Sequence, residues 1–338
     1  MGWVLRATLL ILTVSGISCC SVIQAPQQDD PASATPAVEH CVQWFAKLDA
    51  AVDRAGVRDA GAHRIPGFPY LRADRFLGSF RNTVKDNPSE FASWVDRLRK
   101  LDATARAYEV RNLPASSLAA LGVASVRAAA ARTGTCAAEL SRVELATPEQ
   151  RERLIKGAGV PDEYIERSRI LGLYPLATLP LSVGVRRWQD ATVAMFRREA
   201  AGDDRGHHFV RYEPSGYPLG AARLRAIFAQ ARTDPLGIPQ LSSTDREKLL
   251  ETFAPIFEID TTGAYDRFGP LAWGTGSAPE VDIAHPVVYR RVSYTRYAGH
   301  VLVQLVYTIW FPQRPPEAAL DLLSGRLDGL IFRVTLDP

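Results

Sequence analysis

The sequence has none of the short motifs that mark common enzyme classes. HExxH, GxSxG, GxxxxGK[ST], GxGxxG and CxxC are all missing, which argues against zincin, serine-hydrolase, P-loop, dinucleotide-binding and thioredoxin-like sites in their standard forms. Unrelated enzymes can share a site geometry without sharing a motif, so catalysis is not excluded.

The chain also has no large excess of one charge. Its 40 Lys and Arg residues stand against 37 Asp and Glu residues, which leaves a net charge of +3, and the two signs are mixed along the sequence. Without a basic block, the composition gives no support to nucleic-acid binding.

No apolar run is long enough to cross a bilayer as a helix, but the first 18 residues resemble a secretory signal. An apolar stretch at residues 7–14 is followed by small residues and then by Cys19, an arrangement typical of lipoprotein processing. We expect acyl chains such as palmitate on Cys19 to anchor the protein in the cell envelope, facing the periplasm and favouring the outer membrane. The alternative is an ordinary cleaved signal and a soluble product, because Gly16 stands where a larger aliphatic residue is usual.

Cysteine is scarce, with four in the whole chain. Export would place Cys41 and Cys136 in an oxidising compartment, and both fall on predicted amphipathic helices, so we predict a disulfide between them. Two unpaired buried thiols are the alternative, and Cys20 has no obvious partner.

The chain beyond the signal divides into three regions by composition. Residues 19–37 predict a lipidated flexible tether, residues 38–205 an all-α N-terminal domain, and residues 206–338 an α+β domain with C-terminal antiparallel strands. The fold class is therefore α+β. Apolar spacing and capping signals predict helices at residues 38–56, 88–110, 116–144, 148–157, 162–171 and 185–200.

The second half has the clearest strand signals. Val, Tyr, Thr and Ile are frequent in residues 287–297 and 301–311, and Ala298-Gly299-His300 between them predicts a tight hairpin turn. We expect residues 301–311 to form a central strand that Pro312 ends. Further strands are expected at residues 208–212, 255–259 and 327–336, and helices at residues 219–232, 244–253 and 316–323.

The chain ends abruptly at Asp337-Pro338, a pair that normally opens a turn. This ending suggests a truncated reading frame or a missing last hairpin, although a strand can also be terminal.

Residues 170–185 carry no charge and contain two prolines. A buried helix-turn-helix junction explains them, and a hydrophobic flap that touches a lipid-like ligand is the alternative.

Three groups of residues carry side chains that could bind a metal ion or an anion, or act as acid and base. Asp203, Asp204, His207 and His208 offer oxygen and imidazole ligands for Zn or Mn, unless they are a solvated linker. Acidic residues at predicted strand ends could form an acid/base or metal site with His285, or could simply cap turns. These neighbours of the predicted strands are Asp260, Asp266, Arg267 and Asp282.

The third group lies on the first hairpin strand. Arg290 and Arg296 alternate with Tyr294 on one face, with Tyr289 and Arg291 on the other, and guanidinium groups beside phenols can bind a carboxylate or phosphate. Arginines that protect an exposed strand from aggregation would give the same pattern. No cofactor is predicted.

Several segments together resemble a family of uncharacterised Gram-negative envelope lipoproteins of unknown function. They are GFPYLRADRFLGSF at 67–80, YPLATLP at 174–180, FEIDTTGAYDRFG at 257–269, YRRVSYTRYAGHVLVQLVYTIWFPQRPP at 289–316 and RLDGLIFRVTLDP at 326–338. The resemblance covers most of the mature chain and implies no activity. It also implies a further C-terminal segment with His and Cys together, which this sequence does not contain.

We therefore expect an exported lipoprotein with a structural or binding role, held to a membrane by its lipid anchor. One alternative is a metal-dependent hydrolase with a site between the helical half and the sheet loops. The other is a lipid-binding protein.

Overall fold

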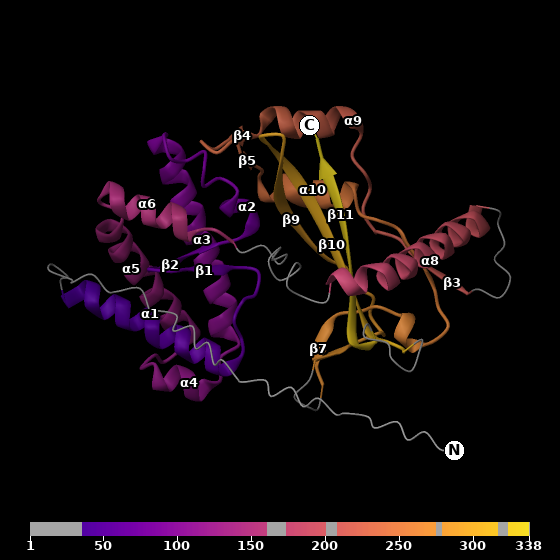
Figure 1. Cartoon of the computed structure of the whole chain (residues 1–338), viewed down its shortest axis with the longest axis horizontal. Helices are drawn as coiled ribbons and strands as arrows, with labels where there is room; N and C mark the ends of the chain where they lie inside the picture. Colours follow the sequence, from indigo (N-terminus) through magenta and orange to yellow (C-terminus); the bar gives the residue numbers. More distant parts are fainter. Residues whose placement is uncertain (1–35, 161–173, 201–207, 275–278, 317–323, 338) are drawn as a thin grey trace, which may run out of the picture.

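A computed structural model describes residues 36–160, 174–200, 208–274, 279–316 and 324–337 (Figure 1). Helices dominate the N-terminal half, and a three-stranded antiparallel sheet with helices beside it forms the centre of the C-terminal half. The predicted α+β class is confirmed. No helix among the described residues is both long and apolar enough to span a membrane.

The N-terminal half is built from helices around a short hairpin. Strands β1 (His63–Ile65) and β2 (Phe68–Ala73) pair antiparallel, and β2 packs between α3 and α5. Its helices are α1 (Pro36–Ala55), α2 (Arg75–Gly78), α3 (Pro88–Arg111), α4 (Ala115–Ala120), α5 (Val126–Glu144) and α6 (Pro148–Gly157).

Two helix starts follow the predicted capping chemistry. The Asn87 side chain accepts hydrogen bonds from the backbone N–H groups of Ser89 and Glu90, and Thr147 forms a reciprocal capping box with Gln150. Such caps satisfy N–H groups that have no partner inside the helix. They fix the starts of α3 and α6.

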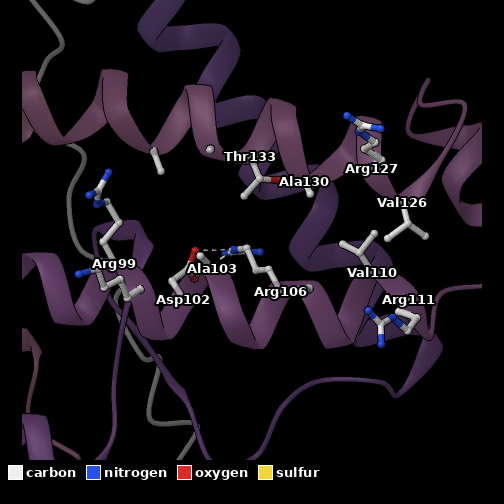
Figure 2. Close-up of a pocket in the computed structure, with 14 residues that line it drawn as sticks. Arg99, Asp102, Ala103, Arg106, Val110, Arg111, Val126, Arg127, Ala130 and Thr133 are labelled. Atoms are coloured by element: carbon white, nitrogen blue, oxygen red, sulfur yellow. Dashed lines mark hydrogen bonds and ion pairs between the residues drawn. The ribbon is translucent and has the colours of Figure 1, made fainter. Parts of the chain in front are cut away.

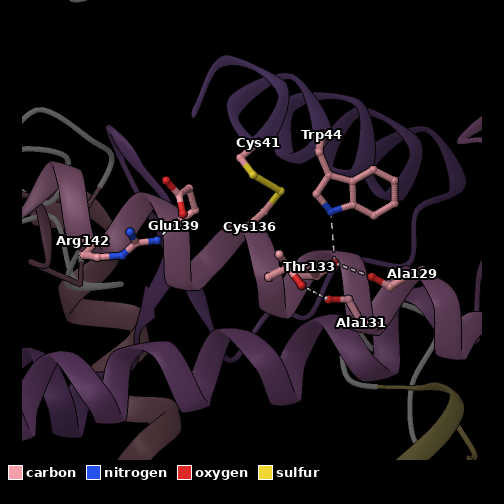
Figure 3. The surroundings of a disulfide bond; sticks show 9 residues. Cys41, Trp44, Ala129, Ala131, Thr133, Cys136, Glu139 and Arg142 are labelled. Carbon is pink, nitrogen blue, oxygen red and sulfur yellow. Dashed lines mark hydrogen bonds and ion pairs between the residues drawn. A yellow bond between two sulfur atoms is a disulfide. The ribbon is translucent and has the colours of Figure 1, made fainter. Parts of the chain in front are cut away.

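The disulfide between Cys41 and Cys136 is confirmed, and it joins α1 to α5 (Figure 3). Beside it, the Trp44 indole N–H donates to the Thr133 hydroxyl at 3.1 Å, and that hydroxyl donates to the Ala129 carbonyl. Both cysteines are buried in the same apolar core, so the covalent link lies where the two helices already pack.

The N-terminal half departs from the all-α expectation by the β1–β2 hairpin. A second correction concerns the helix expected over residues 116–144, which is two helices. Gly122 lies between them with φ +69°, a conformation that favours glycine and ends α4. The helix expected at residues 162–171 lies outside the described residues.

Helix α8 (Tyr174–Ala200) begins eleven residues before the predicted start at 185. Pro175 lies in the first turn, where its missing N–H costs nothing, and Pro180 removes one helical hydrogen bond without ending the helix. The expected helix-turn-helix junction is therefore absent from residue 174 onward.

The large sheet has the strand order β11-β10-β9, so the predicted central strand is confirmed. Ala298 and Gly299 form a two-residue turn with φ 49° and 86°, as a type I′ turn requires. The strands are β9 (Tyr289–Tyr297), β10 (His300–Arg314) and β11 (Gly325–Leu336).

Pro312 does not end β10, contrary to expectation. Phe311 and Gln313 pair with β11 on either side of it, whereas β9 has ended opposite Thr308. The Trp310 carbonyl accepts from the Gly269 N–H on the side of β10 away from β11. Pro312 is two residues further along the strand, so its backbone nitrogen faces the same side, where β9 has already ended. The strand continues because no ladder hydrogen bond is lost.

Two helices cover one face of this sheet. Helices α9 (Ala221–Gln230) and α10 (Ser243–Thr252) pack on Val303, Leu305 and Tyr307, while most of the other face of β10 is half-buried. The remaining described elements are β3 (Phe209–Tyr212), β4 (Arg232–Thr233), β5 (Pro239–Gln240), β6 (Phe257–Asp260), η1 (Ala264–Asp266), β7 (Leu271–Trp273) and β8 (Pro279–Val281).

The two halves share an interface. Tyr294 of β9 stacks on Phe76 of α2 with ring centroids 5.8 Å apart, and Arg97 of α3 pairs with Asp234 at 2.6 Å. Leu236 and Ile238, beyond α9, are buried in the N-terminal core. The loop after α9 is thus part of the helical half's packing.

Candidate functional site

The predicted metal ligands fall into two groups. Asp203, Asp204 and His207 lie outside the described residues. His208 is exposed, and its backbone N–H donates to Asp260 Oδ1 at 3.0 Å. Asp260 therefore caps the start of β3.

The other acidic candidates, Asp266 and Asp282, form hydrogen bonds with groups close to them in the sequence. His285 Nδ1 and Asp282 Oδ2 are 2.9 Å apart and exposed, and this hydrogen bond lowers the pKa of Asp282 below its usual value. Asp266 accepts from the backbone of Thr262 and Gly263, which holds their turn. In the part of the chain that the structure describes, no three His, Cys, Asp or Glu side chains gather as a metal site would require.

The arginines of the predicted anion site have partners within the fold. Arg290 forms an ion pair with Glu247 of α10. Arg296 donates to the Ser79 carbonyl at 2.7 Å and lies 4.3 Å over the Phe80 ring. These two side chains hold elements together and do not converge on a shared ligand position.

A groove between α3 and α5, which the sequence did not predict, has the geometry of a binding site (Figure 2). Its volume is about 540 Å³, within the range of small-molecule sites. Small residues face one another across it at helical spacing, and they leave space that larger side chains would fill. They are Ala103 and Ala107 on α3, and Ala130, Gly134 and Ala137 on α5.

Asp102 and Arg106 form the floor of the groove, and both belong to a buried ionic network that continues beneath it. Asp102 accepts from Arg106 Nε at 2.9 Å and from Arg72 Nε at 3.0 Å. Arg72 also donates to both oxygens of Glu109, each at 2.7 Å, and Arg106 reaches Asp49 at 2.8 Å. Figure 2 shows Asp102 and Arg106 pointing toward each other along α3.

Each buried charge in this network has an opposite charge beside it. Burial raises the pKa of Glu109, but hydrogen bonds from Arg72 and from the backbone N–H of Asp59 outweigh burial and hold that pKa below its usual range. Arg106 Nη2 donates to the Pro69 carbonyl at 2.6 Å. The floor is therefore polar but already satisfied, and leaves no free charge for a ligand.

Positive charge lies at both ends of the groove, and at one end it has no partner among the described residues. Arg111 on α3 and Arg127 on α5 are exposed at one end, on opposite walls (Figure 2). No described residue forms an ion pair or hydrogen bond with either of them. Arg99 and Lys100 lie at the other end, about 18 Å away along α3, and both pair with Asp96.

A second hollow lacks such a floor. It has a volume of about 810 Å³ and lies between α9 and the end of β11, but none of the residues that line it is buried. The α3–α5 groove combines burial below with charge at its ends, so we take it as the candidate site.

Comparison of the chain with protein-family models, curated proteins and solved structures finds no match. The resemblance to envelope lipoproteins therefore stays a prediction. The candidate site is judged on its geometry alone.

One sequence signal could have indicated the groove. Alanines recur four residues apart at Ala103 and Ala107, and small residues recur at Ala130 and Gly134, with arginines at the ends of the same helices. The spacing predicts close helix packing as readily as a groove, so only the placement of the two helices separates these outcomes.

Proposed function

We propose that the chain is an exported lipoprotein of the cell envelope, anchored through Cys19, that acts by binding a ligand. The Cys41–Cys136 disulfide supports export, because such bonds persist mainly in oxidising compartments. The signal-like first 18 residues support it independently.

The groove between α3 and α5 is the observation that carries the binding role. Its walls are apolar, its floor charges are paired, and its free charges are Arg111 and Arg127 at one end. A ligand that matches this arrangement has an acidic head at the arginines and an apolar chain along the small residues. We therefore propose an anionic amphiphile, such as a fatty acid, and this moves the predicted lipid-binding role from residues 170–185 to the groove.

The anchor is tested at the mature N-terminus. Mass spectrometry of the protein purified from membranes is expected to show acyl chains on Cys19, and radiolabelled palmitate is expected to enter the protein. Cys19→Ser is expected to abolish the label. Incorporation of label into the Cys19→Ser protein, or none into the native protein, would count against the anchor.

The groove is tested by filling it. Ala107→Leu places a larger side chain between the helices, whereas Ala92→Leu changes an exposed alanine of α3 away from the groove. We expect the first variant to weaken binding of a fluorescent polyene fatty acid by on the order of tenfold, and the second to leave binding unchanged. Equal binding by both variants would show that the fatty acid does not lie in the groove.

The position of the ligand's acidic head group is tested separately. Arg111→Gln with Arg127→Gln is expected to weaken binding of the acid but not of its methyl ester, which carries no charge. Arg142→Gln, an exposed arginine of α5 outside the groove, is the matched control. An equal loss for acid and ester would contradict the proposed orientation.

A further inference from the structure

The described side chains of α8, residues 182–197, are all exposed or half-buried. Six of them are large and apolar: Trp188 is 68% exposed and Phe196 62%, and Val183, Val185, Val193 and Met195 are each exposed by between 45% and 49%. In Figure 1 one end of the helix is drawn beside the large sheet, and from there the helix extends away from the N-terminal half. Exposed apolar side chains gathered on one helix usually mark a binding surface.

Most of these apolar side chains share one face, with Val193 at its edge and Val183 on the opposite side. The steps from Val185 to Trp188, Thr192 and Met195 are three or four residues, and Phe196 is four residues after Thr192, which places all five along a single stripe. The remaining circumference of this stretch carries Arg186, Arg187, Asp190 and Arg197, with a net charge of +2. The helix is therefore amphipathic and basic.

An amphipathic helix of this kind is stabilised mainly by burial of its apolar face, because isolated helices are marginal in water. The described part of the chain does not bury the face. We therefore expect a binding partner from outside the described fold to bury this face. That partner must be able to contact both aromatic side chains and arginines.

We propose that α8 lies on an anionic lipid surface, with Trp188 and Phe196 in the region between headgroups and acyl chains. Helices with Arg on the polar face and Trp or Phe on the other bind in this position. Anionic headgroups would neutralise the arginines, whereas a second copy of α8 would bring three more arginines to the same flanks. This contact is distinct from the lipid anchor and from the α3–α5 groove.

The test uses the full-length protein reconstituted into vesicles whose lipids carry brominated acyl chains, which quench nearby tryptophan. In vesicles of phosphatidylcholine with phosphatidylglycerol, we expect part of the emission to be quenched. Trp188→Phe is expected to remove that quenchable part. Trp273→Phe is the matched control, because Trp273 is 75% exposed but lies on β7, and it is expected to leave the quenching unchanged.

The charge requirement is tested in the same vesicles. Replacing Arg186, Arg187 and Arg197 with Gln is expected to lower the preference for anionic over neutral vesicles by on the order of tenfold. Near-ultraviolet circular dichroism checks that each variant keeps its tertiary structure. The acylation of Cys19 is measured separately, so loss of the anchor cannot be mistaken for loss of the α8 contact.

Two results would overturn the proposal. Unquenched Trp188 in anionic brominated vesicles would show that the helix does not reach lipid. Self-association of the detergent-free protein that Phe196→Glu abolishes, with no quenching of Trp188, would show that a second copy covers α8 instead.

Discussion

Arg72 is a fully buried arginine on a short strand, and it forms ion pairs with two side chains of α3. Removing a charged group from water is costly, and the cost is offset here by the bidentate bond to Glu109 and by Asp102. The network therefore makes the position of β2 against α3 specific, since a shift of either element would separate the charges.

Glu109→Gln is expected to lower the free energy of unfolding by about 3–5 kcal/mol, because Arg72 would keep a buried charge with too little compensation. Asp96→Asn, which breaks an exposed pair on the same helix, is expected to cost less than about 1 kcal/mol. Urea unfolding of both variants at pH 7 measures the difference. Similar midpoints for the two variants would show that the buried network contributes no more than a surface pair.

The shifted pKa of Glu144 makes the free energy of unfolding depend on pH. Burial raises its pKa from 4.5 to about 7, although Tyr70 and Arg153 favour the ionised form. Between pH 4.5 and about pH 7, the folded protein binds more protons at this carboxyl than the unfolded protein does. The free energy of unfolding therefore falls as the pH rises toward 7. We expect a loss of about 2 kcal/mol, less than the full shift implies, because part of the side chain reaches solvent.

Glu144→Gln is expected to remove this part of the pH dependence. Denaturant unfolding between pH 4.5 and pH 7.5 measures it, and Glu152→Gln on the exposed face of α6 serves as the control. A native slope that survives in the Glu144 variant would assign the dependence to other groups.

At the scale of elements, the disulfide connects helices that are far apart in sequence. Cys41 and Cys136 are separated by 95 residues, and closing a loop of that length removes about 4–5 kcal/mol of unfolded-chain entropy. The double variant Cys41→Ala with Cys136→Ala is therefore expected to lose stability of that order in urea unfolding. Cys20→Ala is expected to lose none, and an equal loss in both proteins would point to an effect unrelated to the bond.

Several elements could be predicted from the sequence because their signals are local. The caps at Asn87 and Thr147 and the repeated apolar spacing identified α3 and α6, and β-branched residues identified β9, β10 and β11. The β1–β2 hairpin could not be predicted. Strand β2 contains Pro69 and Arg72, and the burial of Arg72 depends on α3 residues 30 and 37 positions away.

Candidate site residues were harder to predict than the fold. Arg296 has the chemistry of an anion ligand, but its partners are the Ser79 carbonyl and the Phe80 ring, more than 200 positions earlier in the chain. The type of an ionisable residue does not reveal which distant group satisfies it. The α3–α5 groove was missed for a related reason. It is the space left between two helices by small side chains, and the sequence does not show how far apart those helices lie.

For the whole molecule, the interface between the halves predicts how the chain unfolds. Asp234 accepts from Arg97 at 2.6 Å and from two backbone N–H groups of its own loop, and Arg296 holds β9 against α2. Contacts of this kind couple the stability of the two halves. We expect the two halves of the native protein to unfold together in one transition.

Asp234→Ala with Arg296→Ala is expected to separate this unfolding into two transitions in calorimetry. Arg290→Ala removes an ion pair within the C-terminal half and is expected to keep a single transition. A single transition in the double variant would show that apolar contacts such as Phe76 with Tyr294 are sufficient to couple the halves.

The disulfide also has a mechanical consequence. A pulling force on the chain before α1 would reach Cys41 after the first turns of the helix, and the covalent bond would pass that force directly to Cys136 on α5. The chain between the two cysteines, residues 42–135, would carry none of the load. The hairpin, α3 and the buried ionic network all lie within that protected loop, so tension could straighten the start of α1 without extending them.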